Sequence, residues 1–168
     1  MPDALLTNIA GADGESFFTG PVVQDACNTT TTAIPQGTLV AIQTPITTTT
    51  TTIFGVGAAT SVATTAPLNI GVAIGGSAPG TSIAAAGTVA TAGGTGQVVI
   101  HGHCRALVDS TTTPTVVGHR LIIGGTTAGC LSDAGTTTAA AGLNYGVVLE
   151  ALTPTTTGTL TNIWFEKT

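Results

Sequence analysis

Three side chains with metal-ligand chemistry stand together near the middle of the chain. The segment His101-Gly102-His103-Cys104 brings two imidazoles and a thiol, all groups that zinc accepts as ligands. On a strand, side chains alternate between faces, so His101 and His103 would point one way and Cys104 the other. A zinc ion would then need ligands from elsewhere in the chain. We interpret the segment as a solvated or interface strand face, and we expect no metal and no cofactor.

No other group of residues has the spacing of a reaction centre. A hydrolytic triad on a nucleophile elbow needs Gly-X-Ser-X-Gly, which is missing. The glycine-rich pieces GVGAAT and GGTGQ lack the Lys-Ser/Thr ending of a phosphate loop. No strand-like stretch carries two carboxylates on one face. We expect that the protein is not an enzyme and has no catalytic residues.

The elements that carry these residues are predicted to be β-strands. Of the 168 residues 42% are hydrophobic and only 7% charged, which is unlike a disordered chain. Valine, isoleucine and threonine are abundant, and their branched side chains favour pleated strands over helices. The 23 glycines interrupt every stretch of helical length. The sequence therefore predicts an all-β fold, either a compact β-barrel (β-tulip-like) or a sandwich module, with an extended N-terminal arm.

Two stretches show the alternation of half-buried strands. In the segment TLTNIWFEK (159–167) side chains alternate between two faces. One face carries Leu160, Asn162, Trp164 and Glu166, and the other Thr161, Ile163, Phe165 and Lys167. In QVVIHGHCRALV the same rule gives one face with Val99, His101, His103 and Arg105, and another with Val98, Ile100, Gly102, Cys104 and Ala106. By contrast LVAI, LII and GVVL are short continuous apolar runs, which are typical of strands covered on both sides.

The chain divides into an N-terminal arm, residues 1–33, and a single β-barrel-like domain, residues 34–168. The arm range has no regular alternation, and its alternative interpretation is an ordinary first strand of the domain. Within the domain, LNIGV at Leu68 and LNYGV at Leu143 match position for position, and a turn glycine precedes each, Gly37 or Gly118. This similarity indicates an internal duplication of 34–108 in 114–168.

Charge and targeting features exclude several classes of partner. The net charge is −5 with three basic residues, so the chain cannot neutralise a row of phosphates. We expect no nucleic-acid partner and no membrane association. The N-terminus lacks the basic and apolar regions of a secretory signal, so we expect synthesis and folding in a cytosol. Three widely spaced cysteines are interpreted as buried thiols that pack as small hydrophobic groups.

Large aromatic side chains are rare and are the candidates for contact with other subunits. Tyr145 and Trp164 could anchor an interface or fill the core of a barrel that is otherwise poor in bulk. Phe17 and Phe18 lie side by side in the arm. We predict contact with a neighbouring subunit at these four residues, with a core role as the alternative for Tyr145 and Trp164.

Three phrases in the second half of the chain carry a family resemblance. They are GQVVIHGHCRALV at Gly96 to Val108, VGHRLIIGGTTAG at Val117 to Gly129 and YGVVLEA at Tyr145 to Ala151. In these phrases the chain resembles the capsid decoration (cement) proteins of tailed bacteriophages. His119 is a departure, since aspartate is common at its position in that family.

The resemblance implies a structural virion protein on the outer surface of an icosahedral phage head, made in the host cytoplasm. It implies binding to the major capsid protein, stabilisation of contacts between capsid subunits, and a homo-oligomer, specifically a homotrimer. The alternative is a phage fibre or head-protrusion adhesin that binds glycans of the host surface. A protein whose function is contact with other molecules is consistent with either of these two functions.

Overall fold

The computed structural model describes residues 20–47, 52–59, 69–76, 80–86, 93–109, 114–123, 127–135 and 144–168. Nine strands form this part of the chain, and the predicted all-β fold class is confirmed. Among the described residues there is no helix that could cross a bilayer. The strands are β1 (Val22–Asn28), β2 (Leu39–Thr47), β3 (Thr52–Ala58), β4 (Asn69–Gly75), β5 (Thr95–Asp109), β6 (Leu121–Ile123), β7 (Leu131–Asp133), β8 (Gly146–Val148) and β9 (Thr159–Phe165).

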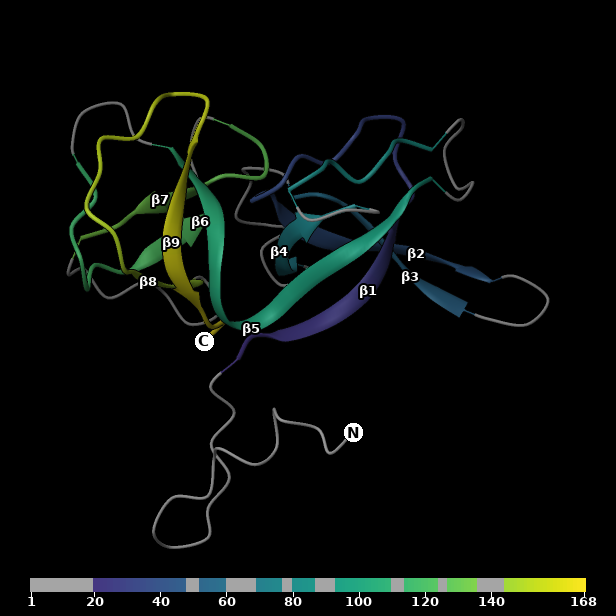
Figure 1. Ribbon diagram of the computed structural model, residues 1–168, viewed down its shortest axis with the longest axis horizontal. Helices are drawn as coiled ribbons and strands as arrows, with labels where there is room; N and C mark the ends of the chain where they lie inside the picture. The colour runs from purple at the N-terminus through teal and green to yellow at the C-terminus, as the bar shows by residue number, and fades with distance from the viewer. Residues whose placement is uncertain are drawn as a thin grey trace, which may run out of the picture.

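The strands close into two barrels that share β5, seen as two lobes in Figure 1. The first barrel runs β1–β3–β2–β4–β5, and the pairing of β1 with β5 closes it. The second runs β5–β7–β6, then β8–β9, and β9 returns to β5. A single bridge between Arg120 and Val147 joins β6 to β8. The N-terminal half of β5 thus belongs to one barrel and the C-terminal half to the other.

The two barrels have the same topology, strand for strand. In each, the first strand pairs parallel with the third and antiparallel with the fifth, so β1 corresponds to the second half of β5. The turn glycines also correspond: Gly37 and Gly118 both have positive φ, 83° and 87°. Their amides donate to Ala73 O at 2.7 Å and to Val148 O at 2.9 Å. The repeating units therefore divide within β5, near Gly102, and each unit is a barrel of its own.

The N-terminal range 1–33 contains β1 of the first barrel. Strand β1 pairs with β3 and β5 along its length, as an ordinary first strand does. The sequence hid this role because four of its seven residues, Val22 to Asp25, are exposed and show no alternation. Residues 1–19 of the predicted arm, with Phe17 and Phe18, lie outside the described residues.

Equivalent positions fill the two barrel interiors. Ile34 and Ile83, joined by a bridge, complete the first interior. At equivalent positions the second interior holds bulkier side chains, because leucine or isoleucine stands where the first has valine, and one valine where the first has alanine. By strand register the equivalent pairs are Ala26 and Ala106, Val40 and Leu121, Val56 and Leu131, Ala73 and Val148, Val98 and Ile163.

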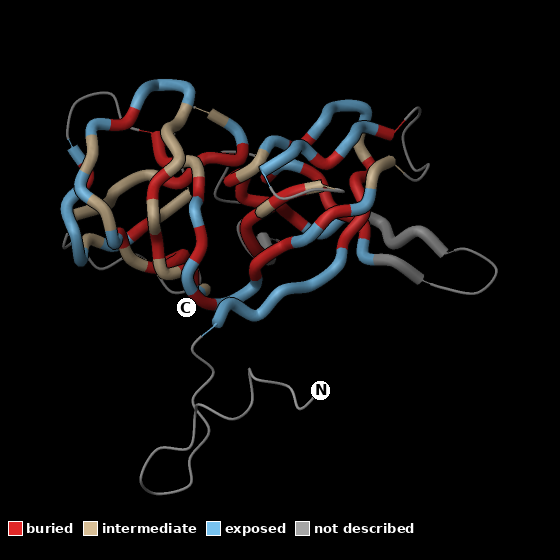
Figure 2. Tube along the Cα trace, viewed as in Figure 1, coloured by how far each residue is buried: buried red, intermediate tan, exposed pale blue. Residues whose placement is uncertain are grey.

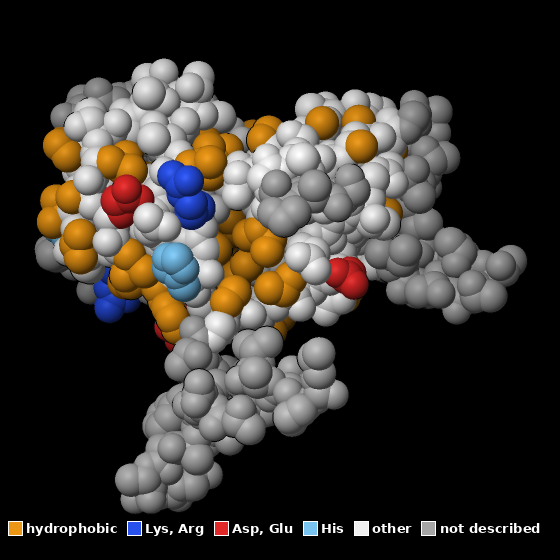
Figure 3. Space-filling model, in the orientation of Figure 1, with side chains coloured by type: hydrophobic (Ala, Val, Ile, Leu, Met, Phe, Trp, Pro, Cys, Tyr) orange, Lys and Arg blue, Asp and Glu red, His pale blue; other side chains and the backbone are white. Residues whose placement is uncertain are grey.

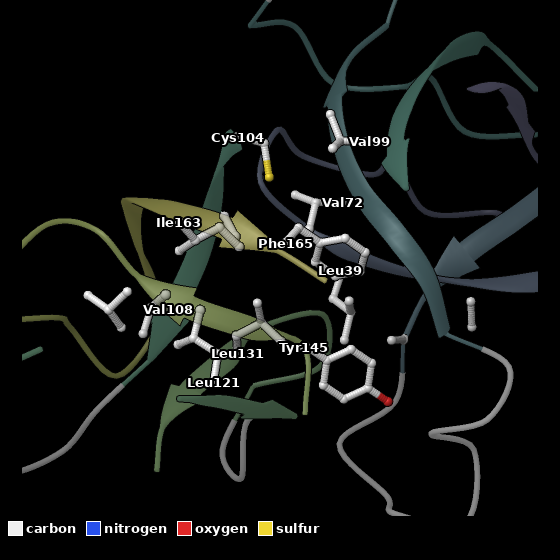
Figure 4. Packing of buried hydrophobic residues seen from close by; sticks show 14 residues of the cluster. Leu39, Val72, Val99, Cys104, Val108, Leu121, Leu131, Tyr145, Ile163 and Phe165 are labelled. Carbon is white, nitrogen blue, oxygen red and sulfur yellow. The ribbon is translucent and has the colours of Figure 1, made fainter. Parts of the chain in front are cut away.

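One hydrophobic cluster joins the barrels. The outer face of the first barrel contributes Leu39, Val72 and Val99 to the same cluster as the second interior. Figure 4 shows the rings of Phe165 and Tyr145, at one end of the second barrel, beside Leu39. Buried segments consequently run through both lobes and meet at the junction in Figure 2. Strand β2 lies between the two cores, which confirms that LVAI is covered on both sides from Leu39 to Ala41.

A bulge in β5 corrects the predicted faces of this strand. Val22 pairs with His101 and Val23 with Val99, which leaves Ile100 as an extra residue. A bulge changes the alternation locally. Val99, predicted on the polar face, is buried, and Ile100, predicted on the apolar face, is 38% exposed. Beyond the bulge the prediction is confirmed, since Gly102, Cys104 and Ala106 are buried while His101, His103 and Arg105 are exposed.

Of the other strand predictions, the one for β9 is confirmed and the one for GVVL is wrong. In β9, Thr161, Ile163 and Phe165 are buried and alternate with half-exposed neighbours, as predicted. The prediction that GVVL is covered on both faces is wrong, because Val147 is half-buried and Leu149 is exposed. The reason is topological: β2 has a second barrel on its outer side, whereas nothing in the described chain covers β8.

We predict that Gly146→Ala strongly destabilises the fold. Gly146 has φ 119°, and an added Cβ would overlap the carbonyl oxygen of Trp164 on the paired strand. Positive φ alone costs an alanine about 1–2 kcal/mol, and the overlap adds to it. We expect a loss of roughly 3 kcal/mol or more in the free energy of unfolding, measured by chemical denaturation.

Gly135→Ala is the matched control for this prediction. Gly135 also has positive φ, 70°, but an added methyl would meet no atom within 4 Å. Only the backbone cost of about 1–2 kcal/mol is expected there. Equal losses in the two variants would contradict the proposed close approach at Gly146.

Candidate binding surface

His101 and His103 lie on the exposed face of β5, at the junction of the barrels. The His101 ring meets the edge of Trp164 with centroids 5.5 Å apart and planes at 85°. His103 is paired in register with Trp164 across β5 and β9. Cys104 is buried on the opposite face, as predicted. Within the described ranges, no three histidine, cysteine, aspartate or glutamate side chains converge as metal ligands would.

The third histidine, His119, helps to hold two segments of the second barrel together. His119 Nδ1 lies 3.0 Å from Asp133 Oδ1, and the Asp133 side chain is almost fully buried. The same carboxylate accepts hydrogen bonds from the amides of Val116 at 3.1 Å and Gly135 at 2.7 Å. It therefore ties the turn before β6 to the end of β7. This geometry gives His119 a structural role in the second barrel.

The three cysteines are buried free thiols. Burial raises the pKa of the Cys104 thiol to about 12. Burial, together with the nearby Asp109 carboxylate, raises the pKa of Cys130 to about 11. Asp109 itself accepts hydrogen bonds from the Thr127 amide at 3.1 Å and from the Ser132 hydroxyl. These thiols stay protonated at neutral pH and pack as small hydrophobic groups.

The four predicted contact residues have different places. Tyr145 is fully buried and its ring stacks on Phe165 at 6.4 Å, which is the core role considered for it. Trp164 is half-buried and reaches the surface beside His101. Phe17 and Phe18 lie outside the described residues. Sequence alone could not separate Tyr145 from Trp164, because both are large aromatic residues in or next to a predicted strand.

A hollow of about 350 Å³ lies on the outer side of the second barrel, where β6, β8 and β9 meet. Trp164 and Val147 give it an apolar part, while Arg120 and Glu166 bring charges of both signs. At Gly118 an added Cβ would meet no described atom within 4 Å, so this side of the hollow is open. Its lining consists of Gly118, Arg120, Asn144, Gly146, Val147, Trp164, Glu166 and Thr168.

Large hydrophobic side chains are exposed in two places. Sequence patterns predicted burial for Ile42 and Leu149, which belong to continuous apolar runs, and for Ile100, on the apolar face of its strand, so the exposure of these three was not foreseen. The view in Figure 3 shows hydrophobic side chains gathered between the two lobes and few charged ones. Five of the exposed residues are in the first barrel, Val22, Val23, Ile42, Phe54 and Ile100, and three are in the second, Val116, Val117 and Leu149.

Comparison with known proteins gives a structural likeness and no family. No family model matches the chain, and no curated protein matches it. Among solved structures, it is similar to the N base of the head fibre protein gp8.5 of bacteriophage phi29, with a TM-score of 0.45 and 15% sequence identity. The match covers 88% of this chain and 95% of that one.

We predict that Cys104 makes the stability depend on pH in the alkaline range. The thiol pKa is about 9 in the unfolded chain and about 12 when folded. The stabilisation is complete below pH 9 and is lost as pH rises toward 12, because only the unfolded state releases the proton there. The free energy of unfolding should fall with a contribution of about 1.4 kcal/mol per pH unit from this residue.

The Cys104→Ala variant tests this assignment. Its unfolding free energy, measured by urea titration between pH 8.5 and 10.5, should fall less steeply than that of the wild type. The cavity left by the substitution lowers stability equally at each pH and so does not affect the slope. Parallel curves for variant and wild type would refute the role of Cys104.

Proposed function

We propose that the protein is a structural virion protein that binds the outer surface of an icosahedral phage head and stabilises contacts between major capsid subunits. The observation that carries the proposal is the character of its surface. Eight large hydrophobic side chains are exposed among the described residues of a chain in which only 7% of residues are charged. On the face shown in Figure 3, hydrophobic side chains gather between the two lobes, and contiguous apolar surface of this kind is typical of protein–protein contact sites.

The rigidity of the fold supports the same proposal. A protein that clamps neighbours loses less entropy on binding when its contact residues are already held in place. Here the two barrels share β5 and one hydrophobic cluster, so the exposed groups of both barrels are parts of one body. The second-half phrases that resemble cement proteins include much of this junction, from Gly96 to Val108 in β5.

The proposed partners follow from the resemblance. They are the major capsid protein and further copies of this chain, as a homotrimer on the outside of the head. Trp164, beside the hollow, remains a candidate contact residue, and Phe17 and Phe18 in the N-terminal segment are candidates from the sequence. Tyr145 supports the contact surface only from within, by packing on Phe165.

Deletion of residues 1–19 tests the role of the N-terminal segment. The deletion stops before β1, so we expect an unchanged β-type circular dichroism spectrum. Binding to undecorated phage heads, measured by co-sedimentation, should weaken, because two aromatic anchors are removed. A Phe17→Ala, Phe18→Ala variant of the full chain should reproduce most of the loss. Wild-type decoration by the deleted protein would contradict a contact through this segment.

The hollow on the second barrel favours a second candidate function, that of an adhesin for host-surface glycans. Saccharides bind in shallow sites that combine an aromatic face with polar groups. The hollow offers Trp164 together with Arg120, Asn144 and Glu166. Its volume of about 350 Å³ lies at the low end of small-molecule sites.

A glycan array separates the two candidates. If the adhesin function holds, the wild-type protein should give distinct hits, and Trp164→Ala should weaken them at least about tenfold, since stacking on the ring is lost. Val23→Ala, on the surface of the first barrel, is the control and should leave the hits unchanged. An array without hits, together with binding to empty heads, excludes this candidate.

A further inference from the structure

The internal repeat shows what covers the outer face of a barrel in this fold. In the first barrel the outer side of β2, β4 and β5 carries Leu39, Ala41, Val72 and Val99, which are buried. They are covered by the end of the second barrel where Phe165 and Tyr145 lie (Figure 4). Two backbone hydrogen bonds of 2.7 Å complete the contact, from Leu39 N to Gly129 O and from Leu107 N to Gly37 O. In this chain the outer face of the first barrel is therefore covered by the end of the second barrel.

The same face of the second barrel is uncovered in the described structure. By strand register Arg120 corresponds to Leu39, Val147 to Val72 and Trp164 to Val99. Arg120 is exposed, and the other two are half-buried around the 350 Å³ hollow. Leu149, the equivalent of the half-buried Ile74, is 42% exposed. We call this surface, Arg120, Val147, Leu149 and Trp164 with the turn at Val117, the open face.

The turn beside the open face shows the difference most clearly. Around Gly37 an added methyl would meet Leu160 and, at 2.9 Å, the amide nitrogen of Leu107, because the second barrel lies against this turn. At Gly118, its equivalent, an added methyl would meet no described atom within 4 Å. The neighbouring Val117 is 57% exposed. The turn at Gly37 is therefore covered by the second barrel, whereas no described residue covers the equivalent apolar turn at Gly118.

The complementary surface is likewise not covered by any residue that the structure describes. The end of the first barrel corresponds to the end of the second that docks intramolecularly. By register Ile42 corresponds to Ile123 and Phe54 to Gly129. By position along the strand Ile100 corresponds to Phe165, since each lies two residues after the equivalent pair Val98 and Ile163. All three first-barrel residues are exposed, by 38%, 37% and 43%. We call this surface, Ile42, Phe54 and Ile100, the end patch.

We propose that copies of this chain associate head to tail, with the end patch of one copy seated on the open face of the next. Each chain thus repeats between molecules the contact that it already makes between its own barrels. Such a contact joins two different surfaces, so it closes into a ring or extends as a filament, depending on the rotation between copies. The inference rests on the internal repeat and does not require the proposed function.

Charge substitutions on each surface test the proposal by light scattering over a concentration series. The open-face variant is Val117→Asp with Leu149→Asp, and the end-patch variant is Phe54→Asp with Ile100→Asp. All these positions are exposed, so the barrels should fold, which circular dichroism and unfolding midpoints check. Each variant alone should associate at least about thirtyfold more weakly than the wild type, since contact anchors are removed.

Mixing the two variants gives the decisive result. The open-face variant keeps an intact end patch, and the end-patch variant keeps an intact open face. An equimolar mixture should therefore form a dimer that neither variant forms alone. Thr156→Asp, which adds the same charge at an exposed position outside both surfaces, should associate like the wild type.

Four outcomes would overturn the proposal. They are a monomeric wild type across the series, wild-type association by either surface variant, a mixture that stays monomeric, or loss of association in the Thr156→Asp control. Head binding is measured separately by co-sedimentation. A wild type that binds heads as a monomer would refute this inference and leave the proposed capsid function standing.

Discussion

The passage of β5 from one barrel into the other is the constraint on which the rest of the structure depends. The last strand of the first unit runs directly into the first strand of the second, with no loop between them. A strand can serve two interiors only if its buried face changes side. The bulge at Ile100 and the positive φ of Gly102, 105°, provide that change within three residues. A methyl at Gly102 would lie 3.0 Å from Pro21 Cα, so the chain entering β1 also depends on this glycine.

The shared strand also explains the division of the hydrophobic residues. Val98 faces the first interior, while the adjacent Val99 faces the cluster that joins the barrels. The same alternation places Leu39 and Val40 of β2 in different clusters. Small aliphatic side chains therefore suffice on both sides of these strands. The few bulky residues, Tyr145 and Phe165, are placed where the end of one barrel meets the wall of the other.

Much of this architecture could be predicted from sequence, because strand alternation and turn glycines are local properties. The alternation of β9, the polar face from His101 to Arg105 and the all-β class follow from such patterns. The paired glycines Gly37 and Gly118 mark equivalent turns for the same reason. The bulge could not be foreseen, since no residue type is specific for it. The number of barrels depends on non-local pairing of β1 and β5, which composition does not reveal.

The candidate binding surface was harder to predict than the fold. Exposed valines and leucines look like core residues in a sequence, and only the neighbours decide. Val72 and Val147 occupy equivalent positions and have the same side chain, yet one is fully buried and the other half-exposed. The cause is the presence of a second barrel on one side only. Likewise Tyr145 is buried at the barrel junction while Trp164 reaches the surface, a difference that depends on tertiary packing.

The absence of a loop between the two units has a mechanical consequence. Domains joined by a linker can swing, but here the orientation of the barrels is set by the backbone of one continuous strand and by the apolar contact beside it. Tension applied across the molecule would load the hydrogen bonds of β5 to β1 and β9 in shear, many at once. The two barrels are therefore held at a fixed distance and angle from each other by β5.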